Sequence, residues 1–266
     1  MSGVLDKILA SKRAEIASLG PPKTAAPRRF AVDVRASLRT KSALALILEI
    51  KKRSPSAGLL STALSVGERA CVYARGGAAM VSVLCDAPFF GGSWDDLAEA
   101  RRALDTAGSS TPLLAKEFIL EPAQLDHARA NGADAALVIV RLAPERVRML
   151  VEEALKRDLE PLVEVANEDE LRVALDAGAR MVGVNARDLD TLQMDAVRAA
   201  RVRASIPDEV IAVHLSGLRR PEDVAELARA RAHAALIGEA LMREDDPTDL
   251  LKRMKAAADF YLPTPE

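Results

Sequence analysis

Short apolar runs rich in β-branched residues recur along most of the chain, and each is followed by a longer segment rich in Ala, Leu, Glu and Arg. The runs begin roughly 20 to 35 residues apart, which leaves room for one crossover helix between consecutive strands. Strands that are apolar on both faces are typical of a buried parallel sheet. The pattern predicts strands at residues 43–50, 78–85, 112–118, 135–140, 161–165, 181–185, 210–216 and 234–238.

The repeated strand and helix unit favours a closed barrel over an open doubly wound sheet. Eight units in about 220 residues match the size of an eight-stranded α/β barrel. No GxGxxG motif follows the first run, which argues against a dinucleotide-binding sheet. The predicted fold is therefore a single α/β domain, a (β/α)8 TIM barrel.

The residues before the first run predict an extra N-terminal helix. Apolar residues recur there at close to helical spacing until Gly20-Pro21-Pro22 ends the pattern. The stretch 21–42 has little periodicity and reads as a connector with one short helix around 32–38. We expect residues 1–42 to form a helix and connector packed on the barrel, and residues 43–266 to form the barrel as the catalytic domain.

Composition excludes several classes of partner. Hydrophobic residues make up 49% and charged residues 29%, as in globular proteins. The 37 basic and 39 acidic residues give a net charge of −2, so nothing points to nucleic acid or an anionic membrane. Cys71 and Cys85 lack metal-ligand spacing and are too few for a disulfide framework. The N-terminus has no signal-like apolar stretch, so we expect a cytoplasmic protein, by default a monomer.

Ionisable residues interrupt the predicted strands near their carboxyl ends, where barrels hold their chemistry. Period-two alternation places Glu49 and Lys51 on one face, pointing into the barrel mouth. Lys116 ends the third run and Glu164 interrupts the fifth. An internal ion pair that only holds the barrel would explain the first two residues alone, but not all four. The sequence predicts that two ammonium groups and two carboxylates converge in one cavity.

Small residues in three loops predict an anion site. Ser56 follows the first strand, Ser216-Gly217 the seventh, and Gly238-Glu239 the eighth. Such residues leave backbone N–H groups open, and the last two strands of barrels frequently hold phosphate. Each loop alone reads as a simple turn. Together they predict phosphate binding, with Glu239 contributing only its backbone because its charge opposes an anion.

Apolar residues near other strand ends suggest a pocket for an aromatic ring. Phe89 and Phe90 lie on a glycine-containing loop in a chain with only 3% aromatic residues. Phe118, Leu137 and Leu189 would complete the pocket, although packing against the leading helix or in the core explains these residues equally well. The sixth strand ends with an amide and a guanidinium, and His214 is expected to be a core histidine rather than a catalytic one.

As a set, these segments resemble the indole-3-glycerol phosphate synthase family over almost the whole chain, including the leading helix. The matching motifs are EIKKRSPSAG (49–58), FFGGS (89–93), KEF (116–118), PLVEV (161–165), GVNARDL (183–189), SGL (216–218) and IGEALM (237–242). The resemblance implies conversion of 1-(o-carboxyphenylamino)-1-deoxyribulose 5-phosphate to indole-3-glycerol phosphate, with loss of carbon dioxide and water.

The resemblance also implies roles for the charged residues. Lys116 would be the general acid toward the ribulose carbonyl, and its charge, with that of Lys51, would attract the substrate carboxylate. Glu164 would be the base or proton shuttle in dehydration, and Glu49 would orient Lys51. The resemblance implies no metal and no organic cofactor.

The remaining implied roles concern substrate binding. Asn185 and Arg187 would fix the substrate, with Ser216 nearby. Phosphate would be held by Ser56, Gly217 and Gly238. The anthranilate pocket would be lined by Phe90, Phe118, Leu137 and Leu189.

One position departs from the family pattern. The family usually has a glutamate directly before the Ser-Gly after the seventh strand, whereas this chain has Leu215. Because a carboxylate near the reacting ring is missing, the chain could be a weak enzyme, a paralogue with altered chemistry, or a binding or regulatory descendant. Phosphoribosylanthranilate isomerase is a further alternative, but Lys51 and Asn185 stand where its pattern needs Cys and Asp.

Overall fold

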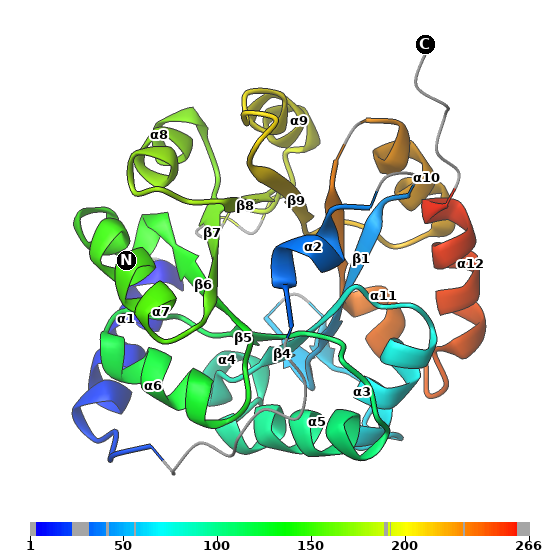
Figure 1. Cartoon of the computed structure of the whole chain (residues 1–266), viewed down its shortest axis with the longest axis horizontal. Coiled ribbons are helices and arrows are strands. Elements are labelled where there is room, and N and C mark those ends of the chain that lie inside the picture. Colours follow the sequence, from blue (N-terminus) through cyan, green and yellow to red (C-terminus); the bar gives the residue numbers. More distant parts are fainter. Residues whose placement is uncertain are drawn as a thin grey trace.

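The computed structural model describes residues 4–22, 32–40, 43–55, 57–188, 191, 193–230 and 232–259. Eight parallel strands close into a barrel in the order β1-β10-β9-β8-β7-β6-β5-β4 (Figure 1). The strands are β1 (Ala45–Ile50), β4 (Met80–Leu84), β5 (Leu113–Lys116), β6 (Ala135–Ile139), β7 (Glu160–Val165), β8 (Met181–Asn185), β9 (Ile211–Leu215) and β10 (Ala234–Ile237). Every strand predicted from the apolar runs is present, and the barrel is confirmed.

Helices form the outer ring of the barrel, as Figure 1 shows. They are α3 (Val66–Arg75), α5 (Trp94–Thr106), α6 (Pro122–Ala130), α7 (Val147–Lys156), α8 (Glu168–Asp176), α9 (Ala196–Ala204), α10 (Pro221–Arg229) and α12 (Thr248–Ala258). Several begin at a capping side chain: Ser65 accepts from the Glu68 N–H and Asn167 from the Glu170 N–H. Their apolar faces pack on the outward residues of the strands.

Several short elements lie in the loops that follow the strands. They are the hairpin of β2 (Arg53–Ser54) and β3 (Gly58–Leu59), the helical turns α4 (Ala87–Phe90) and α11 (Glu239–Met242), and the 3-10 turns η1 (Val140–Leu142) and η2 (Pro144–Arg146). The sequence did not predict the hairpin, because strands of two residues are too short to show an alternating pattern.

Two N-terminal helices lie at opposite ends of the barrel. In α2 (Val34–Leu38), Val34 and Leu38 pack with the interior residues Ala45 and Met80, so α2 covers the end where the strands begin. Figure 1 shows α2 across the middle of the ring of strands. By contrast, α1 (Val4–Ala17) contacts residues that follow the strands, through Ile8 and Lys12.

Alternation along each strand decides which side chains fill the barrel. Ile47, Leu114 and Leu162 belong to the interior cluster, whereas their neighbours Leu46, Leu113 and Val163 pack against the outer helices. The interior parity continues to the ends of the strands, so that polar residues with the same parity face the barrel mouth. This places the candidate residues of β1, β5, β7 and β8 on the inner surface.

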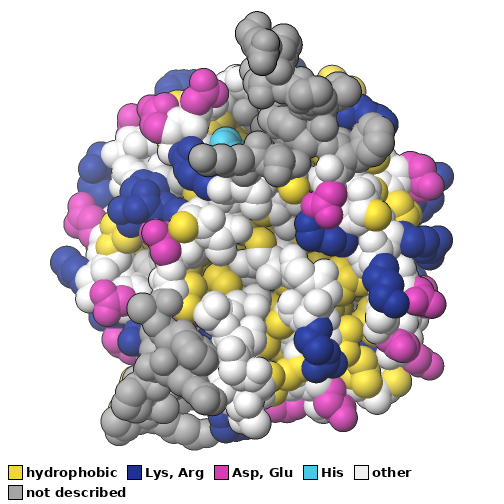
Figure 2. Space-filling model, turned by 45° about the vertical axis from the view of Figure 1, so that its right-hand side comes forward, with side chains coloured by type: hydrophobic (Ala, Val, Ile, Leu, Met, Phe, Trp, Pro, Cys, Tyr) yellow, Lys and Arg dark blue, Asp and Glu magenta, His cyan; other side chains and the backbone are white. Residues whose placement is uncertain are grey.

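The surface carries both signs of charge. On the face drawn in Figure 2, basic and acidic side chains are interspersed rather than gathered by sign. No helix within the described ranges is long and apolar enough to cross a bilayer.

Candidate active site

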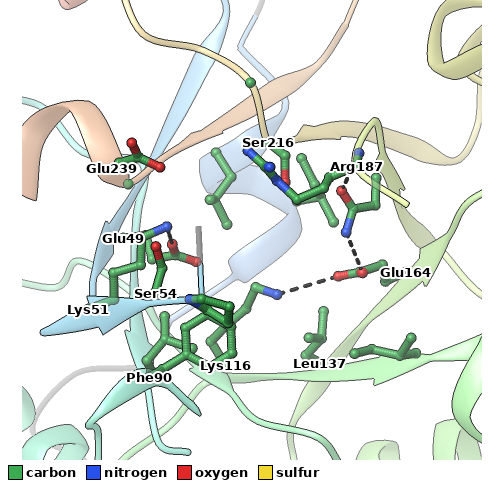
Figure 3. Close-up of a pocket in the computed structure, with 18 of the residues that line it drawn as sticks. Glu49, Lys51, Ser54, Phe90, Lys116, Leu137, Glu164, Arg187, Ser216 and Glu239 are labelled. Carbon is green, nitrogen blue, oxygen red and sulfur yellow. Dashed lines mark hydrogen bonds and ion pairs between the residues drawn. The ribbon is translucent and has the colours of Figure 1, made fainter. Parts of the chain in front are cut away.

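A cavity opens where the strands end. It is lined by every candidate residue that the structure describes: Glu49, Lys51, Phe90, Lys116, Phe118, Leu137, Glu164, Asn185, Arg187, Ser216, Gly217, Gly238 and Glu239. Ser56 and Leu189 lie outside the described residues. Residues from all eight barrel strands or the loops after them therefore meet at one place, as Figure 3 shows for the labelled side chains.

Glu49 and Lys51 form one ammonium–carboxylate pair. Lys51 Nζ lies 2.9 Å from Glu49 Oε1, and the Glu49 side chain is 6% exposed. Gly238 makes room for this pair, because a Cβ on Gly238 would lie 2.5 Å from Glu49 Oε1. A glycine is therefore needed there to keep the carboxylate in place, whatever its backbone N–H binds.

Lys116 and Glu164 form the second pair. Lys116 Nζ lies 3.4 Å from Glu164 Oε2, and Glu164 is almost completely buried. The other carboxylate oxygen, Oε1, accepts a hydrogen bond of 2.8 Å from Asn185 Nδ2. Asn185 Oδ1 in turn accepts from the Arg187 N–H at 2.9 Å. Since both ends of the amide are engaged, Asn185 fixes the orientation of Glu164 and turns Oε2 toward the ammonium (Figure 3).

The turn after β9 has an unusual backbone. Ser216 has φ 73° and Gly217 has φ 96°, both in the left-handed region that non-glycine residues rarely adopt. His214 Nε2 donates to the Ser216 carbonyl at 2.9 Å, which holds this turn. The φ of Gly217 favours glycine whatever the space around it, and a Cβ there would also push aside the end of the Met194 side chain, 2.6 Å away. Ser216 and Gly217 therefore place small residues, with their backbone groups, at the cavity wall.

His214 itself faces the outer helices, as expected for a core histidine. Burial, together with the nearby Arg203, lowers the pKa of His214 from 6.5 to about 4, so the ring is neutral at pH 7. Leu215 takes the adjacent, inward position and is 2% exposed. It packs over Gly183, where a Cβ would lie 2.7 Å from Leu215 Cδ1. The cavity wall at the end of β9 is therefore apolar.

Aromatic and aliphatic side chains line the other end of the cavity. The ring centroids of Phe90, from α4, and Phe118, after β5, lie 6.1 Å apart. Leu137 of β6 and Ile8 of α1 line the same cavity. Ile8 is one of the apolar residues whose spacing predicts the N-terminal helix, but periodicity does not say which surface the apolar face of a helix covers.

Further lining residues were not predicted. Ser54 lines the cavity, and its hydroxyl accepts from the Ala57 N–H at 3.1 Å. Glu117 and Arg219 also line it. Ser54 belongs to the same Ser-Pro-Ser segment as the predicted Ser56, so the sequence carried a signal for it. Glu117 has outward parity in its strand, so strand alternation could not have indicated it.

Two other charged groups have local structural roles. Asp188 accepts hydrogen bonds from the N–H and hydroxyl of Thr191 and pairs with Arg141 at 2.9 Å, so it holds the turn after β8. The side chain of Glu239 lies 2.9 Å from Arg243, and this pairing lowers the pKa of Glu239 against the opposing effect of its burial. Across the described ranges, no group of three or more His, Cys, Asp or Glu residues is arranged to hold a metal ion.

Solved structures of other barrels resemble this fold. A 3-hexulose-6-phosphate synthase aligns with a TM-score of 0.62 at 16% identity, covering 80% of this chain and 99% of that one. A thiamine phosphate pyrophosphorylase from Pyrococcus furiosus aligns with a TM-score of 0.60 at 14% identity, covering 85% and 98%. At such identities the likeness concerns the fold alone.

Sequence relatives are much closer. An indole-3-glycerol phosphate synthase from Mycolicibacterium vanbaalenii is 42% identical over 252 residues, covering 92% of this chain and 90% of the relative. One from Streptomyces coelicolor is 40% identical and covers 96% of both chains. The family model described as indole-3-glycerol phosphate synthase matches residues 5–254. The chain therefore belongs to the indole-3-glycerol phosphate synthase family.

Proposed function

We propose that this chain is a carbon–carbon lyase that converts 1-(o-carboxyphenylamino)-1-deoxyribulose 5-phosphate to indole-3-glycerol phosphate, carbon dioxide and water. The observation that carries the proposal is that two ammonium–carboxylate pairs meet in one cavity between an aromatic end and the small-residue turns after β9 and β10. The substrate has matching parts: a ring, a carbonyl with a nearby carboxylate, and a phosphate.

The substrate ends are assigned by chemistry. The phosphate is bound by backbone groups of Ser216-Gly217 and Gly238-Glu239, with Ser54 lining the same cavity; Ser56 is kept as a further phosphate ligand on the family resemblance alone. The anthranilate ring packs between Phe90 and Phe118, with Leu137 beside it; Leu189 is kept as a pocket residue on the family resemblance alone. Arg187 contacts the chain between the two ends. This orientation leaves the carbonyl between Lys51 and Lys116.

Ring closure needs a proton on the carbonyl oxygen. The ring carbon that bears the carboxylate attacks the carbonyl carbon, and Lys116 donates a proton to the oxygen as it becomes a hydroxyl. Lys51 and Lys116 offset the negative charge of the substrate carboxylate, which draws it into a partly buried site. Loss of that carboxylate as carbon dioxide then restores the aromatic ring.

Dehydration completes the product. The hydroxyl takes a proton from the Lys51 ammonium and leaves as water, and the carbon between it and the nitrogen loses a proton to Glu164. Glu164 passes this proton to Lys116, which ring closure left as a neutral amine, and solvent returns a proton to Lys51. Glu164 is suited to this step because Asn185 fixes its Oε1 while its Oε2 faces the Lys116 ammonium. Glu49 holds Lys51 in place in the same way. No step requires a metal or an organic cofactor.

A second candidate is a binding or regulatory protein that retains the phosphate site. Leu215 favours it, because the apolar wall of β9 supplies no group that could move a proton. Purified protein incubated with the carboxyphenylamino substrate distinguishes the two, since indole-3-glycerol phosphate formation is followed by its fluorescence. Turnover is expected; saturable binding without product would replace the lyase by the binding protein.

We further propose that residues 1–42 and 43–266 act as one unit, because Ile8 of the leading segment lines the cavity formed by the barrel. The active form is proposed to be a cytoplasmic monomer. Sedimentation of the purified chain at micromolar concentration is expected to give a single species of 28.5 kDa.

A further inference from the structure

A lysine of α1 is fully enclosed at the rim of the cavity. The Lys12 side chain has no exposed surface, and its ammonium lies 2.8 Å from Asp86 Oδ1, 2.8 Å from Glu117 Oε1 and 2.7 Å from Glu15 Oε2. The Asp86 and Glu117 side chains are likewise 0% exposed. We call Lys12, Glu15, Asp86 and Glu117 the Lys12 cluster.

The charges of the Lys12 cluster depend on one another. Burial alone would lower the pKa of Lys12, but the Glu117, Asp86 and Glu15 carboxylates outweigh it and raise the pKa, so the ammonium stays charged. A buried ion group of this kind stabilises a fold little compared with well-packed apolar residues. Stability alone therefore does not account for the Lys12 cluster, whose Glu117 lines the cavity.

Each barrel partner of Lys12 holds a ring of the cavity through its backbone. Asp86 precedes α4, and its Oδ2 accepts from the N–H groups of Phe89 and Phe90 at 2.7 and 3.2 Å. Glu117 Oε1 accepts from the Phe118 N–H at 2.7 Å. The same ammonium thus binds the carboxylates that fix the backbone of Phe90 and Phe118, whose rings lie 6.1 Å apart in a tilted arrangement.

Lys12 also fixes the helix on which Ile8 lies. Ile8 is one helical turn before Lys12 on α1, is 5% exposed, and lines the cavity with both rings. One charged group therefore joins three separate segments, α1, the β4–α4 turn and the β5–α6 loop, and each supplies one apolar side chain to the cavity.

We propose that Lys12 is a positioning residue that sets the spacing of Ile8, Phe90 and Phe118, and thereby the affinity for the aromatic end of the substrate. Lys12 acts through Asp86 and Glu117 and does not touch the reacting atoms. This inference rests on the proposed function, because it takes the anthranilate ring as the group bound between these side chains.

The test compares Lys12→Met with Lys7→Met, a matched control on the exposed face of the same helix. The probe is a substrate analogue whose carbonyl is reduced to an alcohol, so that it binds but does not close the ring. Calorimetry is expected to give a dissociation constant about 10-fold or more higher for Lys12→Met, because the two rings lose their common anchor, and an unchanged constant for Lys7→Met. Inhibition by inorganic phosphate is expected to stay the same in both variants.

A double variant separates positioning from stability. Lys12→Met leaves buried carboxylates without a cation, and adding Glu117→Gln removes one of them. The urea midpoint of the double variant is expected to recover toward that of the wild type. Affinity for the analogue is expected to remain low, because Asp86 still lacks its partner and α4 stays unanchored.

The outcomes are distinct. Wild-type affinity in Lys12→Met, or affinity that recovers in step with stability in the double variant, would overturn the positioning role and leave the proposed reaction intact. A wild-type protein that does not bind the analogue would overturn the proposed function and this inference together.

Discussion

The ammonium–carboxylate pairs of the cavity and the Lys12 cluster differ in how far solvent can reach their lysines. In the cavity, Lys51 and Lys116 each face one carboxylate, and their side chains are 15% and 18% exposed. In the Lys12 cluster the ammonium faces three carboxylates and is fully enclosed. A lysine that retains an open side can exchange a proton with a bound molecule, whereas an enclosed one can only hold its neighbours.

Adjacent residues at the end of β5 illustrate the contrast. Lys116 ends the strand with inward parity and reaches the cavity, and Glu117 follows it with the opposite parity and reaches Lys12 under α1. Two consecutive residues therefore have different roles: Lys116 is the proposed proton donor, and Glu117 is part of the Lys12 cluster that positions the aromatic side chains.

Removing the open ammonium is the strongest way to test this contrast. Lys116→Ala is expected to lower kcat by about 10²- to 10⁴-fold, the usual contribution of a general acid. Affinity for the reduced analogue should change much less, because the phosphate turns and the aromatic end remain. Single-turnover product fluorescence and calorimetry measure the two quantities. Retained turnover would show that Lys116 is not the acid.

The enclosed cluster predicts a pH effect on stability instead. Burial raises the pKa of Glu117 from 4.5 to about 7, although Lys12 opposes the shift. Between these two values the folded protein holds a proton that the unfolded chain has released, so the stabilisation from Glu117 is complete below pH 4.5 and is lost as the pH rises through 7.

The corresponding variant is Glu117→Gln, whose amide does not titrate. Between about pH 5 and about pH 8, its free energy of unfolding is expected to gain about 1 to 3 kcal/mol relative to the wild type. Urea titrations of both proteins at each pH measure the difference. Parallel pH profiles would mean that Glu117 is ionised throughout, and the cluster would then be an ordinary ion network.

A smaller effect is expected at the amide that orients Glu164. Asn185→Ala removes a donor to a buried carboxylate, which costs about 1 to 2 kcal/mol in such settings and corresponds to roughly 10-fold in kcat. Asn167→Ala is the matched control, because Asn167 caps α8 outside the cavity and should affect only stability. Equal kcat losses in the two variants would show that Asn185 does not act by orienting Glu164.

The sequence could predict which side chains of the strands face the barrel interior. Once β1, β5 and β7 were recognised as strands, alternation alone placed Glu49, Lys116 and Glu164 inside the barrel. The position of Leu215 inside and His214 outside follows from the same rule. These residues were predictable because period two is a local property.

The Lys12 cluster was not predictable in this way. The helical spacing of α1 indicated an apolar face, but it gave no partner for a lysine on that face. Lys12 meets Asp86 and Glu117 across more than seventy intervening residues, and such contacts leave no trace in a local pattern. The β2–β3 hairpin was missed for the opposite reason, because it is too short to form a pattern.

The same substitution at the two kinds of lysine tests the central claim most directly: kcat and KM for the carboxyphenylamino substrate are measured for Lys116→Met and Lys12→Met side by side. The account predicts that Lys116→Met loses kcat by about 10²-fold or more, and that Lys12→Met raises KM by about 10-fold with kcat nearly unchanged. Loss of kcat in Lys12→Met with an unchanged KM, or unchanged kcat in Lys116→Met, would contradict the division between a reacting pair and an enclosed anchor.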